Sequence, residues 1–191
     1  TNEKIQNFDQ VLSLPQSELA VQTMKDPYVF DFIEYRENLL ESEIEKALIK
    51  NITNMLLELG IGFAFVGNQY HLEVAGEDFY LDLLFYHLKL RCYFVIELKT
   101  GKFIPEYAGK MNFYLSAVDD LVKSKTDNPT IGLIMCRDKN KLIAEYALKD
   151  MTKPIGVSEY KFIQELPIEF EEILPSIKDI ETRITIKEES I

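Results

Sequence analysis

Apolar residues recur every three or four positions in three stretches of the chain, a spacing typical of amphipathic helices. The stretches cover about residues 31–59, 104–122 and 139–148. Gly60 directly follows the first stretch and supplies a C-terminal stop signal. The pattern therefore predicts one long helix ahead of the central part of the chain and two helices after it.

Between and after these helices, short apolar or alternating runs predict β-strands. They lie at residues 62–66, 69–74, 79–87, 92–99, 130–136 and 155–162. The run at 130–136 is apolar throughout, which is typical of a strand buried on both faces. The order of helix, meandering strands, helix, strand, helix and strand predicts an α/β fold, with a mixed central sheet flanked by helices.

A hairpin formed by residues 79–87 and 92–99, with a two-residue turn at Lys89-Leu90, would place Asp82 opposite Glu97. Directly opposed residues on antiparallel strands have Cβ atoms roughly 5 Å apart. Lys99 lies two residues beyond Glu97 and therefore on the same face. The other face is predicted to be an apolar layer of Phe79, Leu81, Leu83, Phe85, Phe94, Ile96 and Leu98. Both faces look buried, so charges there are costly unless they are paired or bind a metal.

Opposed carboxylates repel each other unless a proton or a cation lies between them. Asp82, Glu97 and Lys99 thus supply the groups needed to hold a divalent cation beside a phosphodiester. The D…ExK spacing alone is weak, because 28% of the residues are charged. A structural ion pair between Asp82 and Lys99 fits the pattern equally well.

The first predicted helix offers a third acid. Glu45 shares a helix face with Ile49, Ile52 and Leu56 and should point toward the domain. It is the candidate if an acid from this helix reaches the metal. Spacing alone favours the alternative, a charge at the rim of an amphipathic helix.

At 191 residues the chain is long enough for one domain with appendages. We expect an N-terminal arm or linker at residues 1–30 with one short helix, and a main domain at 31–165. An acidic tail with short helices would follow at 166–191.

Several features favour a cytoplasmic location. No apolar run approaches the roughly 20 residues of a membrane span, and the first residues do not resemble a secretory signal. Cys92 and Cys136 lie in strand-like apolar runs. We expect both to be buried free thiols, which suit a reducing compartment.

The formal net charge of −11 argues against a protein that coats nucleic acid generally. The charge is uneven, however: residues 86–112 hold five lysines and arginines against two acids. A locally basic lip of this kind, including Lys102, could accept a phosphate backbone. A solvated mixed surface accounts for the same charges.

The segments FAFVGNQYHLEV, FYLDLLFYH, CYFVIELKTGK and YAGKMNFYLSAVDD resemble the YhcG-type family of PD-(D/E)XK nucleases, and the likeness extends over about residues 25–160. The resemblance implies a restriction-endonuclease-like αβββαβ core. It assigns Asp82 to the motif aspartate, Glu97 to the D/E position and Lys99 to the motif lysine. Glu45 is similar to the first-helix glutamate of many such nucleases. Gln69 falls in the G-x-Q segment and is expected to line the cleft.

Two positions depart from the family pattern. Asn68 stands where arginine is usual, and Lys110 where glutamine is usual in the A-G-Q-x-N-F-Y-L helix. Loss of the arginine would weaken a phosphate contact that Lys110 could replace. We therefore expect Gln69, Lys102 and Lys110 to bind substrate.

The function implied by the resemblance is metal-dependent hydrolysis of phosphodiester bonds, in DNA rather than RNA, in a restriction, repair or mobile-element setting. Asp82, Glu97, the Leu98 carbonyl and Glu45 would hold Mg²⁺, with Mn²⁺ as a substitute. Two alternatives remain: a catalytically idle nuclease fold that serves DNA binding or dimerisation, and a toxin-like RNase.

The resemblance also bears on partners. Family members commonly carry an N-terminal winged-helix-like DNA-binding region that is absent here, so we expect the chain to be a C-terminal fragment. A homodimer is a further expectation, with Tyr107, Phe113 and Tyr114 assigned either to an interface or to the core.

Overall fold

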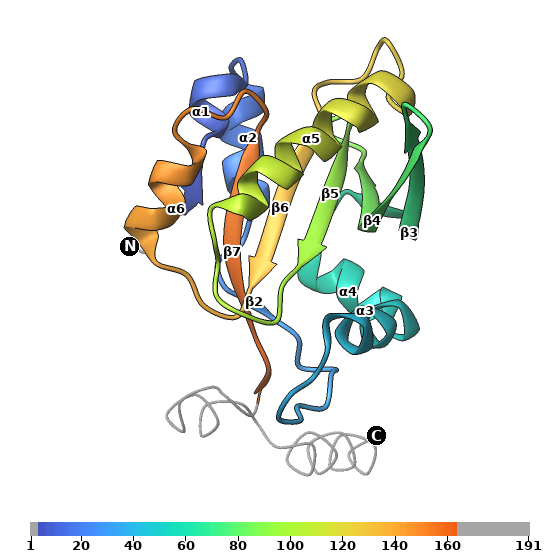
Figure 1. The fold of residues 1–191 in the computed structure, drawn as a ribbon, viewed down its shortest axis with the longest axis vertical. Coiled ribbons are helices and arrows are strands. Elements are labelled where there is room, and N and C mark those ends of the chain that lie inside the picture. Colours follow the sequence, from blue (N-terminus) through green and yellow to red (C-terminus); the bar gives the residue numbers. More distant parts are fainter. Residues whose placement is uncertain (1–3, 164–191) are drawn as a thin grey trace, which may run out of the picture.

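A mixed seven-stranded sheet forms the centre of the molecule (Figure 1). The computed structural model describes residues 4–163, so the predicted tail lies outside the described residues. The helices are α1 (Phe8–Val11), α2 (Gln16–Thr23), α3 (Glu41–Lys50), α4 (Ile52–Leu59), α5 (Glu106–Leu121) and α6 (Lys141–Leu148). The strands are β1 (Ile5–Gln6), β2 (Tyr28–Val29), β3 (Phe63–Val74), β4 (Glu77–His87), β5 (Cys92–Leu98), β6 (Ile131–Cys136) and β7 (Ile155–Lys161).

The strands follow the order β1-β7-β6-β5-β4-β3, and β2 also pairs with β7. Strands β3, β4 and β5 form an antiparallel meander, whereas β5, β6 and β7 are parallel. Residues from α5 and α6 bury one face of the sheet, and residues from α1 to α4 bury the other. The predicted α/β class and the αβββαβ order are confirmed, because α3 and α4 precede β3–β5, and α5 and β6 follow.

The predicted register of the β4–β5 hairpin is confirmed. Leu83 pairs with Ile96, and the ladder continues to His87 and Cys92. The connection contains four residues rather than two, and Arg91 adopts a left-handed φ of 51°. Because the longer turn is centred on the same two residues, the register does not change.

The helix predicted at residues 31–59 is wrong in two respects. Residues 31–40 are not helical, and the rest is divided into α3 and α4 at Asn51. The Asn51 side chain donates a hydrogen bond of 2.9 Å to the Ala47 carbonyl. Asparagine side chains that bond to nearby backbone groups compete with the helical ladder. The two runs at 62–66 and 69–74 are, in turn, one strand with a bulge between Phe65 and Gly67.

One predicted face of the hairpin is also corrected. The sequence places Leu81 on the same face as Leu83, but in the structure it packs in the cluster beneath α5. Phe79 also turns to this side, and its ring centroid lies 4.8 Å from that of Phe113 on α5. The alternation breaks at Asp82, because the β4–β5 ladder ends at Leu83 and Ile96. Past this point β4 pairs with β3 alone and is free to turn its side chains differently.

Residues 4–29 are part of the fold rather than the separate arm or linker that we expected. Strand β1 pairs with β7, and the Asn7 side chain accepts a hydrogen bond of 2.8 Å from the Ile155 N–H. Phe8 is only 1% exposed in the core. The pairing links residues about 150 positions apart, which no local pattern in the sequence could reveal.

Other expectations concern single residues. Cys92 and Cys136 are buried free thiols, as predicted. Tyr114 is buried, whereas Phe113 is exposed. Within residues 4–163, no helix has the length and apolar character needed to cross a membrane.

If residues 4–29 are integral to the core, Phe8→Ala should lower the free energy of unfolding by about 3–5 kcal/mol, as truncation of a buried aromatic typically does. Urea unfolding followed by circular dichroism measures the loss. Leu14→Ala is the matched control, because Leu14 is 71% exposed. A loss below about 1 kcal/mol for Phe8→Ala would show that the segment is dispensable.

Candidate active site

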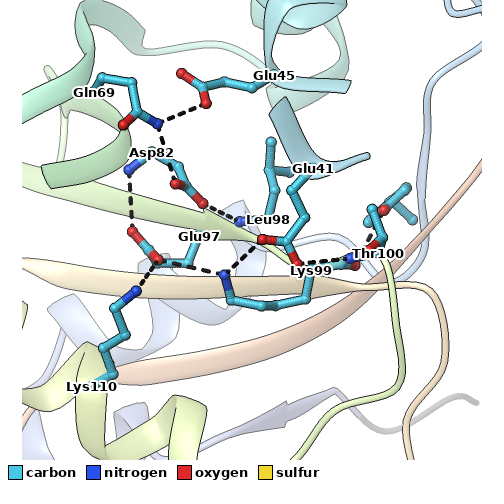
Figure 2. A network of polar contacts seen from close by, with 10 residues as sticks. Glu41, Glu45, Gln69, Asp82, Glu97, Leu98, Lys99, Thr100 and Lys110 are labelled. Carbon is cyan, nitrogen blue, oxygen red and sulfur yellow. Dashed lines mark hydrogen bonds and ion pairs between the residues drawn. The ribbon is translucent and has the colours of Figure 1, made fainter. Parts of the chain in front are cut away.

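Three polar side chains form a row across β3, β4 and β5. The pairs Asn68–Leu83 and Tyr70–Leu81 place Gln69 opposite Asp82. The Leu83–Ile96 pair places Asp82 opposite Glu97. Figure 2 shows these side chains pointing toward one another, with residues from α3 and α5 on either side. The strand register thus gathers the polar row at one place on the sheet.

Asp82 and Glu97 hold each other in position through the backbone. The Leu98 N–H donates to Asp82 Oδ2 at 2.9 Å, and the Asp82 N–H donates to Glu97 Oε1 at 3.2 Å (Figure 2). Each carboxylate therefore satisfies a backbone donor of the neighbouring strand where the ladder ends. The reciprocal bonds fix both side chains on the same face.

Glu97 is a buried carboxylate whose charge is costly. Burial, and secondarily the negative charge of Asp82, raise the pKa of Glu97 to about 7. Its Oε2 atom has no hydrogen-bond partner among the described residues. The nearest cations are the ammonium groups of Lys110 at 3.6 Å and Lys99 at 3.8 Å. The exposed Lys110 and the buried Lys99 thus approach Glu97 Oε2, an oxygen that can still accept a ligand.

Lys99 is held tightly. Its side chain is 10% exposed, and its Nζ lies 3.4 Å from Glu41 Oε2 and 5.4 Å from the Tyr107 ring centroid. The other Glu41 oxygen accepts the Thr100 N–H at 3.2 Å. The first residue of α3 therefore fixes the lysine and the start of the loop that follows β5.

The sequence interpretation missed Glu41. The available signal was its spacing: Glu41 lies four residues before Glu45, and residues so spaced share one helix face. Both acids do turn toward the sheet, where they serve different partners.

Glu45 is buried, as its helix face predicted, but it meets amides rather than Asp82. Its two oxygens accept from Gln69 Nε2 at 2.7 Å and from Asn68 Nδ2 at 3.2 Å. The same Gln69 nitrogen lies 3.5 Å from Asp82 Oδ1. Gln69 has a left-handed φ of 43° beside the β3 bulge. Such a conformation is uncommon outside glycine, and strained residues concentrate at functional sites.

The two lysines expected to bind substrate are placed differently. Lys110 extends from α5 to Glu97 and lies 5.2 Å from the Tyr114 ring centroid. Burial lowers the pKa of Lys110, but Glu97 and Tyr114 outweigh that effect and raise it overall. Lys102 is exposed on the loop after Lys99, where its backbone pairs with Asp138. Within residues 4–163, the Lys102 side chain forms no hydrogen bond or ion pair with the acids of the site.

The donor set suits a hard cation that keeps several waters. Within the described residues, no three Asp, Glu, His or Cys side chains gather closely enough to form a complete metal cluster. Asp82 and Glu97 provide two carboxylates, and the unpartnered Glu97 Oε2 can accept a ligand. Mg²⁺ is commonly bound by one or two carboxylates together with water and substrate oxygens. The carboxylates of Asp82 and Glu97 fit such an ion, and Glu45 contacts this pair only through Gln69 among the described residues.

Cavities within residues 4–163 include one beside the site and another at the edge of the sheet. The smaller, about 270 Å³, is lined by Thr100 together with residues such as Tyr35 and Arg137. The larger, about 480 Å³, lies between β1, α1 and α6 and contains none of the site residues. Of these two, the smaller adjoins the site, through Thr100.

Comparisons with known proteins give one family match. The model of the YhcG PDDEXK nuclease domain matches residues 21–175. "Putative nuclease YhcG" of Escherichia coli (strain K12) is 41% identical over 143 residues, which cover 75% of this chain and 38% of that protein. The chain thus spans about two fifths of the length of this relative.

Among solved structures, the repair endonuclease from Pyrococcus abyssi gives a TM-score of 0.42 at 13% identity, covering 69% of this chain and 49% of that one. A complex of EndoMS with double-stranded DNA gives 0.44 at 13% identity, covering 69% and 48%. Similarity at this level carries no inference about function.

The raised pKa of Glu97 predicts a pH-dependent stability of the metal-free protein. Since the folded state binds this proton more tightly than an ordinary glutamate with a pKa of 4.5, stability should fall as pH rises from about 4.5 to about 7. Glu97→Gln removes that penalty and should stabilise the protein by on the order of 1–3 kcal/mol at pH 8 in chelator. The gain should shrink as the pH approaches 4.5.

Urea unfolding at several pH values in EDTA measures this difference. Glu73→Gln, at an exposed position of β3, is the matched control and should show no such trend. A Glu97→Gln variant less stable than wild type at pH 8 would contradict the burial penalty.

Proposed function

Because the chain belongs to the YhcG PDDEXK nuclease domain family, we propose that its site hydrolyses phosphodiester bonds with the help of a divalent cation, Mg²⁺ by preference. The observation that carries the proposal is the pairing of Asp82 with Glu97, whose buried Oε2 lacks a hydrogen-bond partner among residues 4–163. A fixed lysine lies beside the same oxygen. This is the arrangement expected of an active site rather than of a simple strand ion pair.

Asp82 and Glu97 would hold the ion directly, together with the Leu98 carbonyl and water. Glu45 would support the site by orienting Gln69, which also approaches Asp82. A bound divalent cation stabilises charge on the transferring phosphate and acidifies a bound water. Mn²⁺ has the same preference for oxygen ligands and should substitute for Mg²⁺.

Lys99 would supply positive charge at the reacting phosphate. Its ammonium can orient the attacking water and neutralise the developing negative charge. The Glu41 carboxylate and the Tyr107 ring keep it close to Glu97 rather than in solvent. Preorganised donors of this kind are worth more than mobile ones, because no reorganisation is needed during the reaction.

We propose that DNA is the substrate and that Gln69, Lys102 and Lys110 contact it. Two lysines of the basic stretch at residues 86–112, Lys99 and Lys110, lie against Glu97, although the whole chain is acidic. Such a limited basic surface suits a catalytic part that depends on another region for most of its affinity. An N-terminal DNA-binding region, a homodimer and a cytoplasmic restriction, repair or mobile-element role remain predictions.

One observation favours a second candidate, an idle nuclease fold that binds DNA or mediates dimerisation. Within residues 4–163 the acids do not form a complete three-ligand cluster, and Lys110 lies against the Glu97 oxygen that a metal would use. In this case the site would remain metal-free, with lysines as permanent counter-charges.

Lys99→Ala should lower the rate of cleavage at least ~10²-fold, because it removes a charge that stabilises the transition state. Metal binding should be largely retained. The measurement is cleavage of single-stranded, duplex and branched DNA and of RNA, each with Mg²⁺, Mn²⁺ or EDTA. Cleavage of RNA alone would assign the protein to the toxin-like RNases.

Lys141→Ala on α6 is the matched control, because it removes a lysine that is 54% exposed and lies outside the site. Equal rates for Lys99→Ala and wild type would contradict the proposed role. Wild type that cuts none of the substrates and binds no Mn²⁺ would favour the idle fold instead.

A further inference from the structure

The two ammonium groups beside Glu97 Oε2 are not equivalent. Lys99 lies 3.8 Å and Lys110 lies 3.6 Å from this atom. The Lys99 side chain is 10% exposed and also binds Glu41, whereas that of Lys110 is 52% exposed. Lys99 is therefore fixed from two sides, and Lys110 is the cation that can leave.

The site needs a cation at this position. Glu97 is buried beside Asp82, and two carboxylates so placed repel each other strongly in a poorly hydrated environment. Lys110 reaches the oxygen from a different element, α5, with the Tyr114 ring beneath its ammonium. Lys110 thus brings a positive charge to the two carboxylates from the side that faces solvent.

We propose that Lys110 is a resident counter-cation of the site, which occupies Glu97 in the metal-free protein and competes with a divalent cation for it. The inference rests on the proposed function, because it concerns the same metal site. When Mg²⁺ or Mn²⁺ binds, the Lys110 ammonium moves out along the exposed side of α5, where it can meet a phosphate of the substrate. The lysine thus weakens metal binding until substrate is present.

Three arguments indicate that Lys110 and a divalent cation compete for Glu97 and do not bind it together. Glu97 Oε2 has no hydrogen bond within the described residues, so electrostatic attraction is what holds Lys110 there. The Lys110 side chain has an exposed path away from Glu97, because α5 lies at the surface here. A divalent ion bound to the same oxygen would repel an ammonium only a few ångströms away.

Calorimetric titration with Mn²⁺ tests the competition. Lys110→Gln should bind Mn²⁺ about tenfold more tightly than wild type, because one nearby positive charge is removed. Lys141→Gln on α6 is the matched control: it removes the same charge from a side chain that is 54% exposed and lies outside the site, and should change the affinity less than about twofold. Unchanged or weaker binding by Lys110→Gln would overturn the proposal.

A metal-free measurement tests the resident contact itself. In EDTA at pH 8, Lys110→Gln should lower the unfolding midpoint by about 2–4 °C in the wild-type background and by much less in a Glu97→Gln background. Equal shifts in both backgrounds would show that Lys110 and Glu97 are not coupled, which would overturn the resident contact.

The two measurements separate this inference from the proposed function. If wild type binds Mn²⁺ and Lys110→Gln binds it no more tightly, the competition fails and the nuclease proposal stands. If no variant binds Mn²⁺, wild type included, the proposed metal site fails and the competition fails with it.

Discussion

Two carboxylates that face each other at the end of a β-ladder determine which side chains can surround them. Asp82 and Glu97 lie on adjacent strands where β4 and β5 stop pairing, and each accepts a backbone N–H from the other's strand. Burial and mutual repulsion raise the pKa of Glu97 to about 7. Folding therefore maintains a concentration of negative charge that only protons, ammonium groups or a metal ion can relieve.

The neighbouring elements contribute the side chains that balance this charge or fix the groups that do so. Helix α3 places Glu41 on Lys99, so that one acid outside the pair fixes the lysine inside it. Strand β3 contributes Gln69, which joins Asp82 to Glu45 of α3. Helix α5 adds a lysine from the opposite side. The αβββαβ order thus matters chemically, because the helix before the meander fixes the lysine and the glutamine of the site, and the helix after it brings a positive charge to the acids.

The parts of this arrangement that depend on local periodicity could be predicted from the sequence. A period of two along β4 and β5 fixed the opposition of Asp82 and Glu97, and a longer turn did not disturb it. Leu81 could not be placed, because the alternation breaks where the ladder ends. Glu41 could not be assigned a partner, because its contact with Lys99 joins residues 58 positions apart. The N-terminal strand was missed for the same reason, since its partner is β7 at the other end of the fold.

The most direct test of the metal site is anomalous diffraction from crystals soaked in Mn²⁺. The account predicts a peak about 2.0–2.3 Å from carboxylate oxygens of both Asp82 and Glu97, with water completing the coordination. The Lys110 ammonium should then have moved away from Glu97. A soaked crystal with no peak between these residues, or with the ion bound elsewhere while Lys110 stays on Glu97, would contradict the account.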